Sequence, residues 1–479
     1  MAFLDGTVVN VALPVMQREL GIAVDRVQWI VEAYALLLAS LVLVGGALGD
    51  RYGRKRVFLQ GVGLFAIASA WCGLAPEATS LIVARAVQGV GAALLVPGSL
   101  ALISGAYGEE TRGKAIGTWS AFSAMTAAVG PVAGGWVVEH ASWRWLFFFN
   151  APVAAVVVAL AWRRVGEMRD DSAPKHLDWM GATLATVGLG IVTFALVDSA
   201  RAPGATRMLL LLALGAAVLA AFVVVEAKSR APMVPLTLFR SRKFAGANLL
   251  TLALYAGLGG GLFFVPFDLI QVQGYSPTAA GAAWLPFIVL VSAMSRWAGG
   301  LVVRVGARAL LVGGPLVAAA GFALLAVPGQ GGSYWSTFFP GIVVLGLGMG
   351  LTVAPLTSAV MGAVDARHAG LASGINNAVS RAAGLLAIAA LGVLLVARFN
   401  AALARALAGM DLPADVIATL NAERTKLAAA DVPPALHHVF VTSYLAGFRA
   451  AMIVCSALAA LGAFFAFLFI EPRPNVTST

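Results

Sequence analysis

A ten-residue polar stretch, GALGDRYGRK at residues 46–55, lies between two long apolar segments. Its glycines let two helix ends approach closely, and its single acid, Asp50, stands among bases with which it can pair. Asp50 can also cap the N-terminus of a following helix. A plain cytoplasmic loop would explain the bases, but it would not explain the spacing Gly-x-Leu-x-Asp-x-x-Gly. We therefore interpret this stretch as a structural motif between two membrane helices, made by Gly46, Asp50, Arg51, Gly53, Arg54 and Lys55.

The flanking segments are two of fourteen similar ones. Hydrophobic residues make up 60% of the 479 residues and charged residues 11%, whereas soluble chains average about 45–50% and about 25%. Backbone polar groups in lipid must be hydrogen-bonded within the chain, so such segments form helices. The sequence predicts an all-α polytopic membrane protein with fourteen spans, near 1–20, 29–49, 57–75, 80–104, 115–138, 145–162, 179–199, 208–226, 244–270, 277–300, 309–327, 336–360, 370–396 and 438–470.

The first segment is too short to cross a bilayer. Only the run from Phe3 to Met16 precedes the polar residues Gln17, Arg18 and Glu19, whereas a span needs about 20 apolar residues. We therefore expect the natural chain to begin upstream of Met1, so that its first span is truncated here.

Lys and Arg are distributed unevenly between the loops. With the loop at 50–56 placed inside, 19 of the 32 bases fall in the short inner loops and the tail, and five fall in short outer segments. Four more lie in the long segment 397–437, and long loops follow the positive-inside rule poorly. The asymmetry predicts a multi-pass protein of the cell membrane with both termini in the cytoplasm. It also explains the net charge of +10 without nucleic acid as a partner.

The motif at 46–55 has a degenerate second copy at 299–308, at an offset of 253 residues. Gly, Leu, Arg and Gly recur, but Val303 stands where the first copy has Asp50. Two homologous halves around a central site are a transporter architecture. We therefore expect a six-helix half at 1–162, two inserted helices with cytoplasmic linkers at 163–243, and a second six-helix half at 244–479 with an outer loop at 397–437.

Three further stretches carry a family resemblance: LDGTVVNVALP at 4–14, RAVQGVGAA at 85–93 and GPVAGG at 130–135. Together with 46–55, they resemble the signature motifs of the major facilitator superfamily, and the first looks like that of its fourteen-helix drug:proton antiporter branch. The resemblance covers nearly the whole chain and departs at Val303 and at the short first segment. It implies two six-helix bundles around a central cavity and a role for Arg85 in proton coupling. It also implies a gating hinge at Gly130, Pro131, Gly134 and Gly135.

From the residues alone, two of these features have simpler explanations. Small residues permit close helix packing and Pro131 removes a backbone hydrogen bond, so ordinary packing explains 130–135 equally well. Arg85 is costly inside an apolar span unless it is paired or faces water, and a snorkelling arginine near the outer boundary is the alternative.

Asp5 is the strongest candidate for a proton site. Burial in the membrane favours the neutral form of a carboxylate, and we expect Asp5 to be buried without a charged partner. Glu32, near the outer end of the second span, is an auxiliary candidate, with a solvated interfacial acid as the alternative. We interpret Asp268 as an interfacial acid. The polar residues expected to line a central cavity are Asn10, Gln88, Asn376, Asn377, Arg381 and Arg449.

These features favour a proton-coupled secondary transporter that exports small amphipathic compounds, such as drugs or antibiotics, by alternating access. We found no motif of an enzyme or a metal site, and the phosphate-loop-like stretch 108–115 has Ala115 where a hydroxyl would hold magnesium. We therefore expect no enzyme activity and no cofactor, only cargo, protons and the lipid bilayer as partners, and a monomer. One alternative is an exporter of organic anions or amino acids, because Arg85, Arg381 and Arg449 make the core basic. Another is a non-transporting membrane sensor.

Overall fold

The chain is built from helices in the computed structural model, which describes residues 1–169, 178–199, 205–229, 232–365, 369–408, 410 and 412–471. Within these residues, twelve helices are long and apolar enough to cross a membrane. All fourteen predicted segments fall on helices, but α1 (Ala2–Leu20) and α5 (Glu109–His140) are not among the twelve. In the 19-residue α1, the charged residues Asp5, Arg18 and Glu19 lower the apolar content. The structure therefore confirms a multi-pass helical membrane protein, and the count of fourteen spans stays a prediction.

The described residues divide into two compact units. The first contains residues 1–235, 269–282 and 408–440, and the second contains 236–268, 283–407 and 441–479. The remaining main helices of the first unit are α2 (Val24–Tyr52), α3 (Arg54–Leu74), α4 (Ala78–Ala106), α6 (Arg144–Phe148), α7 (Asn150–Arg164), α8 (Trp179–Asp198), α9 (Ala205–Lys228) and α11 (Pro277–Ala282). Those of the second are α10 (Arg242–Phe267), α12 (Leu285–Val305), α13 (Ala307–Leu325), α14 (Tyr334–Met361), α15 (Ala369–Leu407) and most of α17 (Pro434–Phe469).

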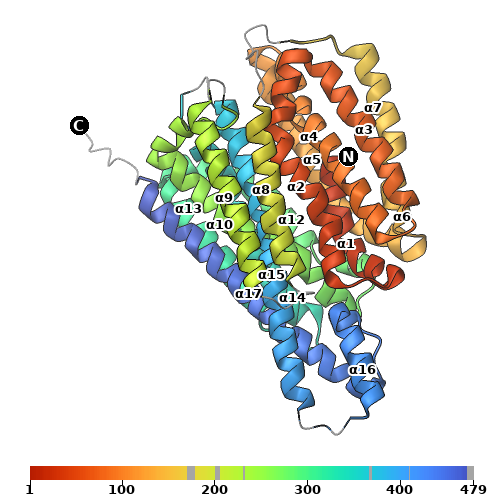
Figure 1. Ribbon diagram of the computed structural model, residues 1–479. Coiled ribbons are helices and arrows are strands. Elements are labelled where there is room, and N and C mark those ends of the chain that lie inside the picture. Colours follow the sequence, from red (N-terminus) through yellow and green to blue (C-terminus); the bar gives the residue numbers. More distant parts are fainter. Residues whose placement is uncertain are drawn as a thin grey trace. The chain divides into compact units, whose positions relative to one another are not determined.

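In the first unit, α4 packs closely on both α2 and α3 (Figure 1). Glycines on α4 make this approach possible. A Cβ atom added at Gly89 would lie 2.5 Å from the carbonyl oxygen of Tyr34, and one added at Gly91 would lie 2.6 Å from the backbone nitrogen of Phe65. Small residues at helix contacts are the usual route to tight packing in membranes. In the same unit α1 packs on α5, and α8 packs on α9 and α2.

The two copies of the predicted repeat have the same local structure. Gly53 separates α2 from α3 with φ 108°, and Gly306 separates α12 from α13 with φ 83°. Positive φ values favour glycine, because an L side chain is strained there. The glycine that both copies share is therefore the residue that the helix junction requires. Asp50 has no counterpart in the second copy, so the junction itself does not need an acid.

The segment 397–437, expected to be an outer loop, is largely helical. Helix α15 continues to Leu407, and α16 (Ala414–Glu423) and the 3-10 helix η4 (Arg424–Ala429) follow. Residues 397–407 are rich in Ala, Leu and Arg, which have high helix propensity, so the helix outlasts the apolar segment.

Glu423 holds the end of this segment in place. Its carboxylate accepts hydrogen bonds from Lys426 Nζ at 2.7 Å and from the Asp431 N–H at 2.9 Å. Partial burial alone would raise the pKa of Glu423, but these bonds outweigh it and hold the pKa below its ordinary value. The segment also contacts α1, because Gln17 Nε2 donates to the Lys426 carbonyl oxygen at 3.2 Å.

Candidate functional site

Three polar side chains from α1 and α4 meet in the interior of the first unit. Arg85 Nη1 donates to Asp5 Oδ2 at 2.5 Å and to Gln88 Oε1 at 2.7 Å, and Gln88 Nε2 donates to Asp5 Oδ1 at 2.9 Å. Arg85 and Gln88 are one helical turn apart on α4, so both face α1. Each carboxylate oxygen of Asp5 therefore accepts a hydrogen bond.

The ion pair is almost fully withdrawn from solvent, with both side chains 1% exposed. Arg85 Nε donates to the carbonyl oxygen of Ile30 at 3.0 Å, and its guanidinium lies 4.3 Å from the ring centre of Tyr34. The alternative of a snorkelling Arg85 is therefore wrong, because the side chain is buried and paired. The expectation that Asp5 lacks a charged partner is also wrong, because Arg85 lies beside it.

The network extends beyond the predicted residues to α3 and α7. Gln88 Nε2 donates to Ser69 Oγ at 3.3 Å, and Asn150 Nδ2 donates to the same oxygen at 2.9 Å. Ser69 in turn donates to the carbonyl oxygen of Phe147 at 2.9 Å. Asn150 Oδ1 is buried without a hydrogen-bond partner among the described residues. Sequence reasoning missed Ser69 and Asn150, and the only signal was a polar residue within an apolar segment.

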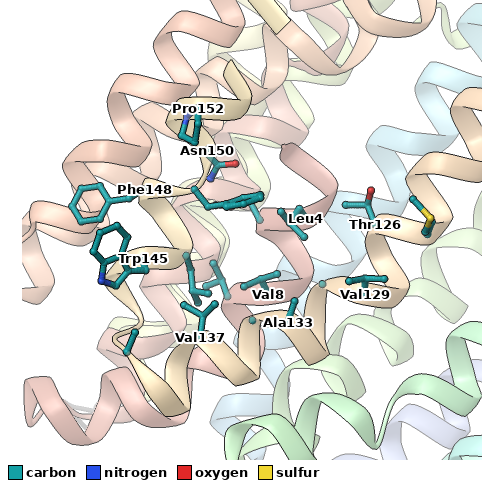
Figure 2. Close-up of a pocket in the computed structure, with 18 residues that line it drawn as sticks. Leu4, Val8, Thr126, Val129, Ala133, Val137, Trp145, Phe148, Asn150 and Pro152 are labelled. Carbon is teal, nitrogen blue, oxygen red and sulfur yellow. The ribbon is translucent and has the colours of Figure 1, made fainter. Parts of the chain in front are cut away.

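A cavity of about 760 Å³ lies beside Asp5, bounded by α1, α5 and the α6–α7 segment. Its walls are apolar apart from Asp5, Thr126, Asn150 and the indole of Trp145. Figure 2 shows Leu4 and Val8 from one wall, Val129, Ala133 and Val137 from α5, and the Asn150 amide at one end. None of the six residues expected to line a central cavity lines this one.

The glycines of the predicted hinge lie at two helix contacts within the first unit. A Cβ atom added at Gly130 would lie 2.8 Å from Thr7 Oγ1, and one added at Gly134 would lie 2.5 Å from Val8 Cγ1. The absence of a side chain at both glycines therefore allows α1 to pack closely on α5. Gly135 faces the other way, where an added Cβ atom would lie 2.8 Å from Thr278 Cα at the start of α11. The motif thus packs α5 between α1 and α11. Pro131 lies inside α5, between Gly130 and Gly134 in the sequence.

Glu139, at the end of α5, holds the start of α11. The Thr278 N–H donates to Glu139 Oε2 at 3.2 Å. Hydrogen bonds from Thr278 and Ser276 lower the pKa of Glu139. The sequence carried no sign of this contact, because the two residues are far apart in the chain.

In the motif at 46–55, Asp50 at the end of α2 pairs with one base at the start of α3. Arg54 Nε donates to Asp50 Oδ1 at 2.8 Å, and both side chains are partly exposed. The cap of α3 comes instead from Glu167, whose carboxylate accepts from the Lys55 N–H at 3.0 Å and the Arg56 N–H at 3.2 Å. Sequence reasoning missed Glu167, one of several acids in the charged linker that follows α7. The suggestion that Asp50 caps this helix is not what the structure shows.

Gly53 makes room for that cap. A Cβ atom added at Gly53 would lie 2.7 Å from the Glu167 carboxyl carbon. Lys55 Nζ also donates to the carbonyl oxygen of Trp162 at 3.1 Å, and Arg51 lies 5.0 Å from the ring centre of Tyr52. Two helix junctions, α2–α3 and the exit from α7, are therefore tied together at this motif.

Glu32 is completely buried, and neither carboxylate oxygen has a hydrogen-bond partner among the described residues. Trp29, one turn before it, contacts Phe194 of α8, and Leu36, one turn after it, faces Gly190. Glu32 therefore lies on the face of α2 that packs against α8. The alternative of a solvated interfacial acid is wrong for Glu32.

The predicted cavity residues differ in their surroundings. In the second unit, Asn376 Nδ2 donates to Thr251 Oγ1 at 2.7 Å and to Asn248 Oδ1 at 3.1 Å. Arg449 is exposed and donates to the Pro328 carbonyl oxygen at 3.5 Å. Asn377 is exposed and Arg381 half-buried in the second unit, and Asn10 is half-buried in the first. Asp268 is 1% exposed, which contradicts its interpretation as an interfacial acid.

Comparison with known proteins gives a consistent picture. Residues 1–388 match the Major Facilitator Superfamily. The chain is 35% identical over 405 residues to multidrug resistance protein Stp of Mycobacterium tuberculosis, covering 84% of this chain and 75% of the relative. It is 36% identical over 395 residues to a puromycin resistance protein of Streptomyces alboniger, covering 82% and 78%. It is 31% identical over 491 residues to a tetracenomycin C resistance and export protein of Streptomyces glaucescens, covering 99% and 90%.

Solved structures show the same fold. A bacterial homolog of the human lysosomal transporter Spinster, in an inward-facing and unoccupied conformation, aligns with a TM-score of 0.67 at 18% identity. The alignment covers 97% of this chain and 93% of that one.

Proposed function

The chain belongs to the major facilitator superfamily, and we propose that it is a proton-coupled exporter of small amphipathic compounds such as antibiotics. The relatives named above are resistance proteins for several drugs, and one is described as an export protein. The single observation that carries the proton-coupling part of this proposal is the buried Asp5–Arg85–Gln88 network.

In this proposal, Arg85 and a proton compete for Asp5. In the described arrangement Arg85 occupies the Asp5 carboxylate, so in this proposal a proton binds only after the two separate. At an effective dielectric constant near 20, an ion pair about 4 Å apart is worth about 4 kcal/mol. One pH unit supplies about 1.4 kcal/mol per proton, and a potential of 100 mV supplies about 2.3. The two quantities are of similar size, so protonation can drive the separation of α1 from α4.

Glu32 is the auxiliary proton site in this proposal. A buried carboxylate without a partner is too costly to stay charged, so Glu32 carries a proton in the described conformation. Arg85 neutralises Asp5, and it is not available for an anionic cargo in this conformation.

The remaining parts of the proposal follow the predicted topology. Fourteen spans place both termini in the cytoplasm of a cell-membrane protein that acts as a monomer without a cofactor. The motif at 46–55 and its Glu167 cap act as a cytoplasmic gate, and the α5 glycines act as a hinge. Residues Asn10, Gln88, Asn376, Asn377, Arg381 and Arg449 line a central path for cargo.

The test is uptake of puromycin or tetracenomycin C into inside-out proteoliposomes whose lumen is made more acidic than the outside medium, so that protons leave as cargo enters. Wild-type protein should accumulate cargo against its gradient, and Asp5→Asn should not. Asp198→Asn is the matched control, because Asp198 forms a 3.0 Å ion pair with Arg207 whose side chain is 58% exposed. If wild-type accumulation does not depend on the pH gradient, or if Asp5→Asn transports as well as wild type, the assignment of Asp5 as the proton-coupling site is wrong.

A further inference from the structure

The cavity beside Asp5 has the features of a ligand site that is separate from the predicted central path. Its volume of about 760 Å³ lies within the range of about 300–1,000 Å³ that is typical of small-molecule sites. Its walls are apolar with few polar groups, as such sites usually are. All three of its walls, on α1, α5 and the α6–α7 segment, belong to the first unit.

The polar end of the cavity contains an acceptor that the protein leaves unused. Asn150 is 2% exposed and lines the cavity, and its Nδ2 is occupied by Ser69. Its Oδ1 is buried without a hydrogen-bond partner among the described residues. An unpaired buried acceptor is costly, so its persistence calls for an explanation. Both oxygens of Asp5, the other acceptor there, are already bonded.

The other end of the cavity opens on an apolar surface. The cavity residues Met125, Val129, Trp145 and Phe149 are each more than half exposed. In the most apolar part of the span that contains α6 and α7, only 22% of the residues are buried. Exposed apolar side chains on a membrane-spanning helix face lipid, so a molecule dissolved in the bilayer can reach the cavity directly.

We propose that this cavity binds a lipophilic cargo molecule that carries one N–H or O–H donor, with its apolar body between α1 and α5 and its donor on Asn150 Oδ1. The proposal rests on the proposed export function and adds to it the class of cargo and the place where its apolar part is held. Cargo in this position lies against Asp5 and Val8 on α1. Bound cargo therefore contacts α1, and in the proposed transport cycle α1 must separate from Arg85.

The test is equilibrium binding of two tritiated probes to purified protein in lipid nanodiscs, measured by scintillation proximity. N-phenyl-1-naphthylamine has one N–H donor, and its N-methyl derivative has none. Ala133→Trp fills the cavity, and Ala151→Trp is the matched control, because Ala151 is exposed on α7 and does not line the cavity. Val129→Trp with Val156→Trp as its control repeats the comparison if Ala133→Trp does not fold.

We expect the cavity-filling variants to bind both probes at least about tenfold more weakly, and the controls to stay within about twofold of wild type. Asn150→Leu should weaken the donor probe about five- to tenfold, as expected for one lost hydrogen bond, and leave the N-methyl probe within about twofold. Equal losses for both probes in Asn150→Leu would show that the acceptor has no role. Equal binding by filled and control variants would show that the cavity is not the site, and an absence of saturable binding would show that lipid alone occupies it. Because binding is measured without a pH gradient, each of these results is independent of whether the protein transports.

Discussion

The Asp5–Arg85 pair should contribute far more to stability than any exposed ion pair of this protein. Asp5→Asn leaves the Arg85 charge buried without a counter-charge, and Arg85→Met does the same to Asp5. Removing one partner of a buried pair typically destabilises a protein by about 3–5 kcal/mol. Removing both leaves no buried charge, so the double variant should lose less than the sum of the two single losses. We expect a coupling energy of at least about 2 kcal/mol.

The assay is denaturant unfolding of the purified protein in a mild detergent, followed by tryptophan fluorescence, for wild type, the two single variants and the double variant. The matched cycle uses Asp198→Asn and Arg207→Met, which remove an ion pair of 3.0 Å with an exposed arginine. Exposed pairs contribute about 0–1 kcal/mol and are screened by salt. The control cycle should therefore show little coupling, and its coupling should fall further in 1 M salt.

The reasoning fails if the losses at Asp5 and Arg85 simply add. Additive losses would mean that the two side chains do not sense each other, and the competition between Arg85 and a proton would then have no basis. A coupling energy as strongly reduced by salt as that of the control pair would contradict the burial of the site.

Three further predictions concern other parts of the first unit. Gly134→Ala should slow transport by pushing α1 off α5, and adding Val8→Ala, which removes the clashing methyl groups, should restore the rate in a proteoliposome flux assay. Glu32→Gln replaces a neutral acid by a neutral amide, so the unfolding free energy should change by less than about 1 kcal/mol, while proton release from solubilised protein on cargo addition falls for some cargoes only. The pKa of Glu423 is lowered in the folded protein, so its stabilising bonds are present above the ordinary pKa and are lost as the pH falls through the lower folded value. The protection factor of the Asp431 amide, which is the intrinsic exchange rate divided by the observed one, should therefore fall below about pH 4, and in Glu423→Gln this fall should be absent.

The helices could be predicted from the sequence because lipid leaves a chain few choices. Every apolar segment lies on a helix, since no other local structure satisfies its backbone groups in a bilayer. The Gly53 and Gly306 junctions could be predicted from the repeat, since a positive φ needs glycine. The C-terminal end of α15 and the helix α16 could not, because beyond the apolar segment the apolar pattern no longer marks where a helix stops.

The candidate site could be predicted in its members but not in its contacts. Asp5 and Arg85 each stood out as charges in apolar segments, yet 80 residues separate them, and only the packing of α1 on α4 makes them partners. Glu167 and Glu139 were missed for the same reason. Each bonds to backbone N–H groups more than one hundred residues away, and such bonds leave no pattern in the chain.

Helix α1 links the proton site to the predicted hinge. One part of it carries Asp5, which Arg85 and Gln88 hold against α4. Thr7 and Val8, only two and three positions further along α1, are the residues that pack against the α5 glycines. A rigid helix cannot release one contact while keeping the other unchanged, so under the proposed function we expect protonation of Asp5 and movement of α5 to be coupled through less than two turns of α1. We expect the cavity that lies between α1 and α5 to change shape with the same movement, so that cargo bound there would alter the affinity of Asp5 for a proton.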